Sequence, residues 1–308
     1  MSVQQLKAEE FTILGLSANE GEILAEKPMT YLQDAWRRFK KNKVALMAAL
    51  LLLLIALFVV IVPFVSPYDF SAQDLLSRNQ TPDGTHWFGT DTLGRDLFTR
   101  VAVGGRVSIA IGICGALIVA VVGCLYGGLS VYFGGAVDML MMRIVDILSS
   151  VPNLLVVILL SVVLDSSSIG TLLFAMTVTG WCPVARLVRA QMLQINRLEY
   201  VMAARVMGVS PIQIVIKHFI PNTISVIIVN ITFRIPGFIF SEAFLSYVGL
   251  GVQAPNTSWG ALASAAQSSL LFYPYQMLFP ALFIALTTLC FTLMGDGLRD
   301  ALDPKLRR

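Results

Sequence analysis

Long apolar stretches alternate with polar segments along this 308-residue chain. Apolar runs of about 18 or more residues are typical of transmembrane helices. The first run would rise about 33 Å as a helix, enough to cross a hydrocarbon core of about 30 Å. Six such stretches are predicted to span the membrane, at residues 44–65, 107–133, 144–164, 166–185, 219–247 and 277–295. The pattern therefore predicts an all-α integral membrane protein with six transmembrane helices.

Composition supports the membrane location. Hydrophobic residues make up 56% of the chain and charged residues 13%, whereas soluble domains carry about 25% charged residues. A net charge of +3, without a basic run interleaved with aromatic residues, argues against nucleic-acid binding. The cysteines lie in apolar segments without CxxC spacing, so we interpret them as small buried side chains rather than disulfide or metal ligands; they are Cys114, Cys124, Cys182 and Cys290.

The distribution of cations predicts the orientation of the chain. Residues 1–29 are polar and lack the pattern of a cleavable signal, so we expect a flexible cytoplasmic tail. Residues 31–43 are basic and aromatic, which suits a helix at the membrane surface. With both termini inside, 16 of the 22 Lys and Arg residues fall on the cytoplasmic side, as the positive-inside rule requires.

A domain organisation follows from these assignments. It comprises a cytoplasmic tail with a basic juxtamembrane helix (1–43), the first transmembrane helix (44–65), an external loop (66–106), a transmembrane domain (107–295) with an internal loop (186–217), and a cytoplasmic C-terminal tail (296–308).

The sequence lacks the motifs of an enzyme or an ATP-driven motor. No lysine follows a glycine, so the GxxxxGK[ST] phosphate-binding loop is absent. The two histidines, His86 and His218, are far apart on opposite sides of the predicted membrane, which argues against a His-based metal site. No GxSxG motif and no embedded cluster of acids is present. If the chain moves a solute actively, a partner must supply the energy.

An internal segment has the features of a docking element. Residues 199–207 favour a short helix, Gly208 suits a left-handed closing position, and Ser210 with Pro211 suits the start of a second helix. Ala203 and Ala204 offer small side chains at which the helix can enter a groove of another protein. By themselves the residues favour the plainer interpretation, an amphipathic connector lying on the membrane.

Residues 199–221 resemble the EAA loop of ABC-importer permeases. Two alanines, three residues, a glycine, nine residues and an apolar-x-Leu-Pro ending define that loop, and Ala203, Ala204, Gly208 and Pro221 match this spacing. Met202 and Ile220 replace the motif's glutamate and leucine, so the glutamate's role does not carry over. The resemblance implies that this region couples the permease to an ATPase. The implied coupling residues are Glu199, Ala203, Ala204, Arg205, Gly208 and Pro221.

Other motifs extend the resemblance over nearly the whole chain from Tyr31. Residues 86–96, 242–251 and 295–304 look like the second permease subunit of oligopeptide, dipeptide and nickel importers, closest to the oligopeptide type. The family implies a type I ABC-importer permease (MetI-like) fold in a bacterial cell membrane. It also implies a homologous second permease, two cytoplasmic ATPase subunits that bind ATP and Mg, and an external peptide-binding protein. No cofactor is expected on this chain itself.

Two charged residues in the fifth span are further candidates. An arginine at the centre of a membrane helix costs about 2.5 to 3.5 kcal/mol on insertion scales and usually faces a cavity or a partner. Arg234 and Glu242 either form structural contacts within the bundle or line the translocation path. A direct pair would need a kink at Pro236 and Gly237, because eight residues separate the two charges by about 80° on an ideal helix.

Charged residues near the ends of the predicted transmembrane helices have either a structural or a functional role. Asp91 and Arg95 either form a helix-supporting pair, with Thr90 or Asp91 as the cap, or contact an external binding protein together with Asp96. The acids of the C-terminal segment end a helix in a basic tail, which favours a solvated or ATPase-facing end over a metal site; they are Asp296, Asp300 and Asp303.

The function predicted by the resemblance is ATP-driven uptake of oligopeptides, with this chain forming half of the transmembrane path. The same architecture also serves dipeptides or nickel, and this subunit alone does not separate these substrates. An ATP-independent secondary transporter or channel is the alternative from another class, and the EAA-like loop argues against it. A membrane enzyme would need a catalytic constellation, which the sequence lacks.

Overall fold

The computed structural model describes residues 31–164 and 168–303, and within these ranges the chain is helical, with an isolated bridge between Thr90 and Asp96 instead of strands. The first half contains α2 (Tyr31–Lys41), α3 (Lys43–Val65), η2 (Leu75–Ser77), α4 (Leu97–Phe133), α5 (Gly135–Ser150) and α6 (Asn153–Val163). The second half contains α7 (Ile169–Thr177), α8 (Cys182–Ile195), α9 (Glu199–Val206), α10 (Pro211–Ile214), the π-helical turn η3 (Val215–Phe219), α11 (Ile220–Tyr247), α12 (Trp259–Ala266), η4 (Gln267–Ser269) and α13 (Tyr275–Leu302).

The apolar helices can be grouped into six membrane spans. Among the described residues, α3, α4, the run Pro211–Tyr247 and α13 are each long and apolar enough to cross a membrane. The pairs α5 with α6 and α7 with α8 pass the same test together, although they bend by 77° and 50°. Counting each bent pair as one span gives six, so the all-α, six-span architecture predicted from the sequence is confirmed.

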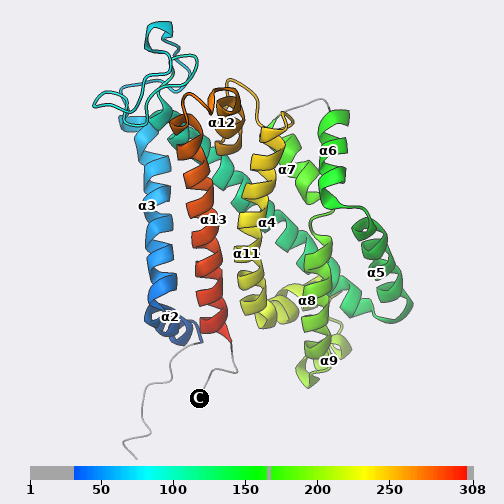
Figure 1. Cartoon of the computed structure of the whole chain (residues 1–308). Coiled ribbons are helices and arrows are strands. Elements are labelled where there is room, and N and C mark those ends of the chain that lie inside the picture. The colour runs from blue at the N-terminus through cyan, green and yellow to red at the C-terminus, as the bar shows by residue number, and fades with distance from the viewer. Residues whose placement is uncertain (1–30, 165–167, 304–308) are drawn as a thin grey trace, which may run out of the picture.

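The elements divide between two ends of the bundle. Figure 1 shows α2, α9 and the end of α13 at one end, which we call the α9 end. The segment 66–96, which we call the long loop, lies at the opposite end with α12 (Figure 1). The candidate sites described below are distributed along this axis.

Helix α4 forms the centre of the bundle. Its 37 residues extend about 55 Å, longer than a membrane core is thick, and the helix crosses the bundle obliquely (Figure 1). Glycines let other helices approach it closely: a Cβ added to Gly112 would lie 2.7 Å from Ile239 of α11, and one added to Gly123 would lie 2.7 Å from Val184 of α8. Small residues at such crossings are typical of membrane helix packing, where close van der Waals contact drives association.

The second span begins earlier than the sequence predicts. Helix α4 begins at Leu97, so the last ten residues of the predicted 66–106 loop are helical. The charged side chains that made this segment look like a loop have partners within the chain. Arg100 donates from Nη1 to the carbonyl of Phe70, at 2.9 Å.

Arg106 satisfies part of the backbone of α3. Pro63 has no N–H and therefore cannot donate to the carbonyl of Val59, four residues earlier. The Nε of Arg106 donates to that carbonyl at 2.9 Å, and its Nη2 donates to the carbonyl of Val60 at 2.8 Å. The guanidinium also lies over the Phe64 ring. A residue predicted as part of an external loop thus completes the hydrogen bonding of the first span.

The third and fourth spans are broken helices. The predicted 144–164 span is interrupted at Val151, whose extended backbone precedes Pro152, a position at which proline disfavours helical geometry. The fourth span, predicted at 166–185, continues as α8 to Ile195 after a bend. Arg186 and Arg189 are therefore helical, and the predicted internal loop 186–217 is too long at its start.

Ion pairs with α5 stabilise the charged arginines within α8. Arg186 donates from Nη2 to Asp146 of α5 at 2.9 Å, and Arg189 donates from Nε to Asp138 of α5 at 2.6 Å. The last helix also continues beyond the predicted boundary at Gly295 to Leu302, so Asp296 and Asp300 are on α13. The predicted N-terminal tail 1–29 and the last five residues lie outside the described part of the chain, as does the predicted start of the fourth span.

Candidate functional site

The helix α9 and its turn have the geometry expected from the sequence. The backbone N–H of Gly208 donates to the carbonyl of Arg205 and that of Val209 donates to Ala204, which is the Schellman pattern of a helix end. Gly208 has φ of +76°, the left-handed region that favours glycine. Ser210 then caps the next helix by accepting a hydrogen bond from the N–H of Gln213. The predicted helix, turn and second helix are confirmed.

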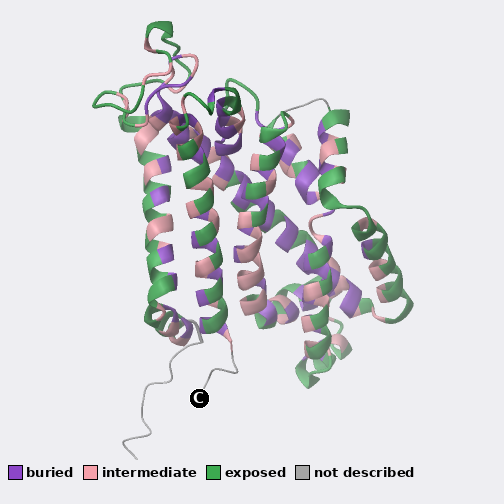
Figure 2. Cartoon of the chain, viewed as in Figure 1, coloured by how far each residue is buried: buried purple, intermediate pink, exposed green. Residues whose placement is uncertain are grey.

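The two alanines of the candidate motif differ in their surroundings. Ala203 is exposed, whereas Ala204 is buried against this chain. The expectation that both present themselves to another protein is therefore wrong for Ala204. Two neighbouring apolar side chains that were not predicted as contacts are strongly exposed: Val206 is 89% exposed and Met207 75%. Figure 2 shows α9 largely in the colour of exposed residues.

Arg205 attaches α9 to the body of the protein. Its Nη2 donates to the carbonyl of Tyr132 at 2.9 Å and to Oδ1 of Asn196 at 2.7 Å, and its guanidinium lies over the Tyr132 ring. Arg205 therefore positions α9 against the end of α4. Glu199, in the first turn of α9, and Pro221, in the first turn of α11, are exposed.

A polar cavity of about 520 Å³ lies between α11 and the broken helices. Arg234 lines it from near the middle of α11. Its Nε donates to Oδ1 of Asn230 at 3.2 Å, and its Nη1 contacts the carbonyl of Gly180 at 3.4 Å, at the bend between α7 and α8. The other polar residues of the lining are Asn153, Thr179 and Ser241.

A second cavity, of about 600 Å³, lies next to the first. The two cavities share Asn230 and Phe233 in their linings. The second includes residues near the end of α13, among them Arg299 and Asp303, so it extends toward the α9 end. Both cavities lie along one side of α11 and have amide and hydroxyl side chains in their linings, and we call the two together the polar route. Sequence reasoning missed its amides, although Asn230 is an unusual residue in a membrane span and lies one helical turn from Arg234.

Glu242 is enclosed in a different place. It is 0% exposed, and its carboxylate accepts hydrogen bonds from Ser108 Oγ at 2.8 Å and Ser246 Oγ at 2.7 Å. Ser108 Oγ in turn accepts from the N–H of Trp259, at the start of α12. Glu242 therefore joins α4, α11 and α12. It does not line either cavity and does not pair with Arg234, so of the two predicted path residues only Arg234 faces a cavity.

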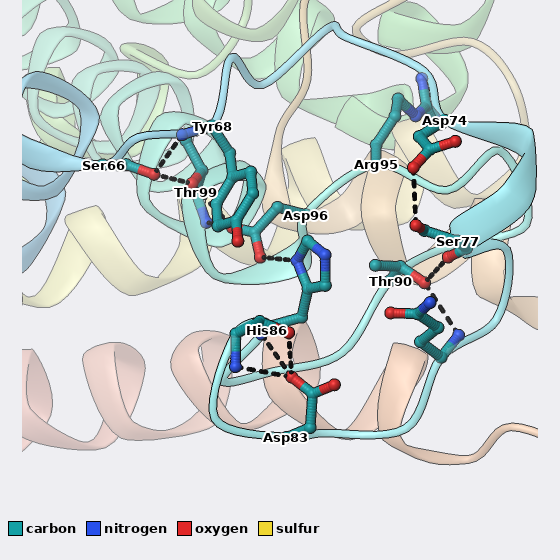
Figure 3. Close-up of polar contacts among 12 residues, drawn as sticks. Ser66, Tyr68, Asp74, Ser77, Asp83, His86, Thr90, Arg95, Asp96 and Thr99 are labelled. Carbon is teal, nitrogen blue, oxygen red and sulfur yellow. Dashed lines mark hydrogen bonds and ion pairs between the residues drawn. The ribbon is translucent and has the colours of Figure 1, made fainter.

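The long loop is organised by carboxylates (Figure 3). Asp96 caps α4: its Oδ2 accepts from the N–H and the hydroxyl of Thr99, at 2.8 and 2.7 Å. Its Oδ1 lies 3.0 Å from Nδ1 of His86, whose ring contacts the Tyr68 ring at a tilt of 35°. Ser66, at the end of α3, completes the cluster through a 2.6 Å hydrogen bond to Thr99.

Asp91 and Arg95 form a pair, but not on a helix. Asp91 accepts from the N–H groups of Leu93 and Arg95 and from Arg95 Nε at 2.7 Å, which closes a turn. The cap of α4 is Asp96, so the expectation that Thr90 or Asp91 caps a helix is wrong. Asp91 and Asp96 are buried. Their side chains therefore support the loop and offer little surface for a partner.

Exposed carboxylates fix the outer turns of the long loop. Asp83 accepts from the backbone of His86 and from Thr85, and Asp74 accepts from Ser77 and the N–H of Leu76. These hydrogen bonds hold the pKa of both carboxyl groups below the ordinary value of 3.8. Both acids therefore stay charged at neutral pH, and the turns keep their hydrogen bonds.

Two family models match the chain. Residues 100–308 match the binding-protein-dependent transport system inner membrane component, and residues 30–82 match the N-terminal TM domain of oligopeptide transport permease C. The chain belongs to the binding-protein-dependent transport system inner membrane component family. Members of this family are transport components without a catalytic role of their own. ABC-importer permeases work with ATPase and substrate-binding partners.

Relatives match nearly the full chain. The oligopeptide transport system permease protein OppC of Bacillus subtilis is 44% identical over 99% of this chain and 100% of its own length. The dipeptide transport system permease protein DppC of the same organism is 46% identical over 97% of this chain and 94% of its length. OppC of Escherichia coli is 45% identical over 94% and 96%, respectively.

A solved structure supports the fold. A chain of the MetNI methionine ABC transporter, in an inward-facing conformation, aligns with a TM-score of 0.52 and 20% identity, covering 66% of this chain and 96% of its own. The match confirms the MetI-like fold implied by the family resemblance. The chain is thus a multi-pass membrane permease subunit of an ABC importer.

Proposed function

We propose that this permease carries oligopeptides across a bacterial cell membrane, driven by ATP. The observation that carries the proposal is the near full-length similarity to the oligopeptide permease OppC. The polar route beside α11 is compatible with a peptide cargo, because amide and hydroxyl side chains line it and form hydrogen bonds with peptide groups. Dipeptides or nickel are the alternative cargoes within the same architecture.

The α9 end lies in the cytoplasm, with both chain termini. Support comes from the cations, which concentrate in segments that end there, among them α2 with Arg37, Arg38, Lys40 and Lys41. The long loop, with Asp69, Asp74 and Asp83, then faces the outside. An external peptide-binding protein would deliver its cargo at this end.

The partners are a homologous second permease and two ATPase subunits, which hold ATP and Mg on their own chains. Helix α9 is the coupling element and enters a groove of one ATPase. Exposed residues of α9 and of the turn after it would make the contact, among them Glu199, Ala203 and Gly208; Pro221, in the first turn of α11, is exposed as well. Ala204 and Arg205 hold the helix in place from within this chain.

The transport cycle follows from this arrangement. ATP binding would close the ATPases and, through α9, turn the path between the two permeases outward to receive the peptide. Hydrolysis would return the path to the inward state. Arg234 lines the part of the path that this chain contributes. Glu242 would keep α12 in register with α4 and α11 during these movements.

Uptake of a labelled tripeptide into vesicles that contain the complete complex tests the proposal. We expect accumulation with ATP and none without it, even when an ion gradient is imposed. Accumulation driven by the ion gradient alone would favour a secondary transporter, and equilibration without any energy source would favour a channel. Mass spectrometry of the co-purified subunits and bound ligand would separate oligopeptide, dipeptide and nickel cargoes.

A further inference from the structure

The cavity beside Arg234 has an excess of positive charge. Among the described residues that line it, none is Asp or Glu, and Arg234 forms no ion pair with any of them. A guanidinium has five N–H groups. The structure gives Arg234 two hydrogen bonds, one to the Asn230 amide oxygen and a long one to the Gly180 carbonyl. The remaining N–H groups are available to a ligand in the cavity.

The broken helices add to this potential. Asn153, the first residue of α6, and Pro183, near the start of α8, both line the cavity. Neither helix has a side-chain cap at its N-terminus. Helix N-termini carry partial positive charge and favour anions, and broken helices in transporters direct such ends at anionic groups of the cargo. Two helix ends and a guanidinium thus converge on one cavity within the membrane-spanning part of the bundle.

Two asparagine side chains organise the surroundings of the Arg234 guanidinium. Asn153 donates from Nδ2 to Thr179 Oγ1 at 2.8 Å, which fixes the start of α6 to the bend between α7 and α8. Asn230 holds Nε of Arg234 from one turn earlier on α11. The hydrogen bonds of Arg234 to Asn230 and Gly180 use Nε and Nη1, and they leave Nη2 without a partner among the described residues. The N–H groups of Nη2 can donate to a carboxylate, in a charge-assisted hydrogen bond.

We propose that Arg234 forms a subsite for the terminal carboxylate of the peptide as it passes through this permease. The inference rests on the proposed function, since it assumes a peptide cargo. A peptide at neutral pH has an ammonium at one end and a carboxylate at the other. An electropositive, acid-free cavity repels the first and attracts the second. The carboxylate therefore occupies the cavity beside Arg234, and the neighbouring amides bind the last peptide groups.

The experiment compares two peptides in two backgrounds. ATP-driven uptake of tri-alanine and of tri-alanine amide is measured in proteoliposomes that contain the complete importer, with either the native chain or Arg234→Gln. The same binding protein is used throughout, so its own preference cancels in the ratio of variant to native rate. We expect the rate for tri-alanine to fall about tenfold, the value of one hydrogen bond to a charged group. The rate for the amide should change less than about twofold.

Two further variants separate charge from structure. Arg234→Lys keeps the positive charge but not the planar array of N–H donors. It should reduce the rate of tri-alanine uptake less than Arg234→Gln does. Arg143→Gln removes an exposed cation of α5 whose partner Asp146 retains Arg186, and it should affect neither peptide selectively. N-acetylation of tri-alanine should leave the effect of Arg234→Gln intact.

The outcomes distinguish the inference from the proposed function. An equal fall for both peptides would show that Arg234 only joins α11 to the α7–α8 bend, and would overturn the inference. Unchanged uptake of both would overturn it as well. If the native complex imports neither peptide with ATP, the proposed function fails and the inference fails with it.

Discussion

The long loop and the α9 segment are both hydrophilic connections between spans, but they differ in how their side chains are used. The acids of the long loop accept hydrogen bonds within the loop, and two of them, Asp91 and Asp96, are buried against backbone and side-chain donors of the same chain. Helix α9 uses one half-buried cation, Arg205, to attach itself, and leaves Val206 and Met207 exposed. Both segments also present exposed apolar side chains, with Leu76 and Trp87 on the long loop.

The difference shows that charge in a membrane protein's loops has two separate uses. In the long loop, charges replace a hydrophobic core that a segment of this length cannot build. At the α9 end, charges fix the position of a helix whose contacts are made elsewhere. Exposed apolar residues outside the membrane-crossing helices are a sign of a docking surface, and they are present at both ends of the bundle.

Gly94→Ala is expected to have the largest effect on the long loop. Gly94 has φ of +74°, and an added Cβ would lie 1.7 Å from the carbonyl oxygen of Asp74. Such a contact requires backbone movement, and we expect a loss of at least about 3 kcal/mol in unfolding free energy. Chemical unfolding of the purified complex measures it. Gly84→Ala is the matched control, because nothing lies within 4 Å of its added Cβ. Equal stability of the two variants would contradict a tightly packed loop.

Glu242→Ala is expected to cost about 2 to 3 kcal/mol, because it leaves two buried serine hydroxyls without their acceptor. Glu242→Gln keeps an acceptor oxygen and should cost under about 1 kcal/mol. The thermal unfolding midpoint of the complex reports both. Peptide selectivity should stay unchanged in either variant, since Glu242 reaches neither cavity. A change in selectivity would place Glu242 on the path after all.

Arg106→Ala should lower the unfolding free energy by about 1 to 2 kcal/mol, since it leaves the Val59 carbonyl without a hydrogen-bond donor. The test is a double-mutant cycle with Pro63→Ala, which restores a backbone N–H for the same carbonyl. In that background Arg106→Ala should cost clearly less. Equal costs in both backgrounds would show that Arg106 acts through the Phe64 ring instead.

Val206→Asp should have the smallest effect on stability and a clear effect on assembly. Val206 is almost fully exposed, so the unfolding free energy should change by less than about 0.5 kcal/mol. The amount of ATPase subunits that co-purify with the permease should fall about fivefold, as expected for the loss of one interface contact of more than 1 kcal/mol. Leu76→Asp, at an exposed position of the long loop, should leave it unchanged. Loss of ATPase with both variants, or with neither, would contradict the assigned roles of the two ends.

Much of the fold could be predicted because membrane insertion depends on local composition. The limits of the first span and the turn at Gly208 follow from runs of apolar residues and from backbone preference, which are properties of neighbouring residues. The start of α4 and the extent of α8 could not be predicted. Arg100, Arg186 and Arg189 are charged, and only partners distant in sequence make them acceptable within helices.

The candidate sites divide in the same way. Their motif positions could be found from spacing, but the directions of their side chains could not. Ala203 and Ala204 are neighbours of the same type, yet a helix turns them about 100° apart and only one is exposed. Glu242 and Arg234 are both charges in an apolar span, and their opposite surroundings depend on Ser108 from α4 and on the bend between α7 and α8.

Apolar runs, motifs and turn residues are enough to predict six membrane crossings, the family resemblance and a helix–turn–helix between spans. Those properties depend on apolar length, motif spacing and backbone preference, each a local quantity. Which charges are paired within the chain and which face a cavity depends instead on how the helices pack. Burial and pairing of a charge depend on groups up to 134 residues away, as for Ser108 and Glu242, and no local pattern contains that information.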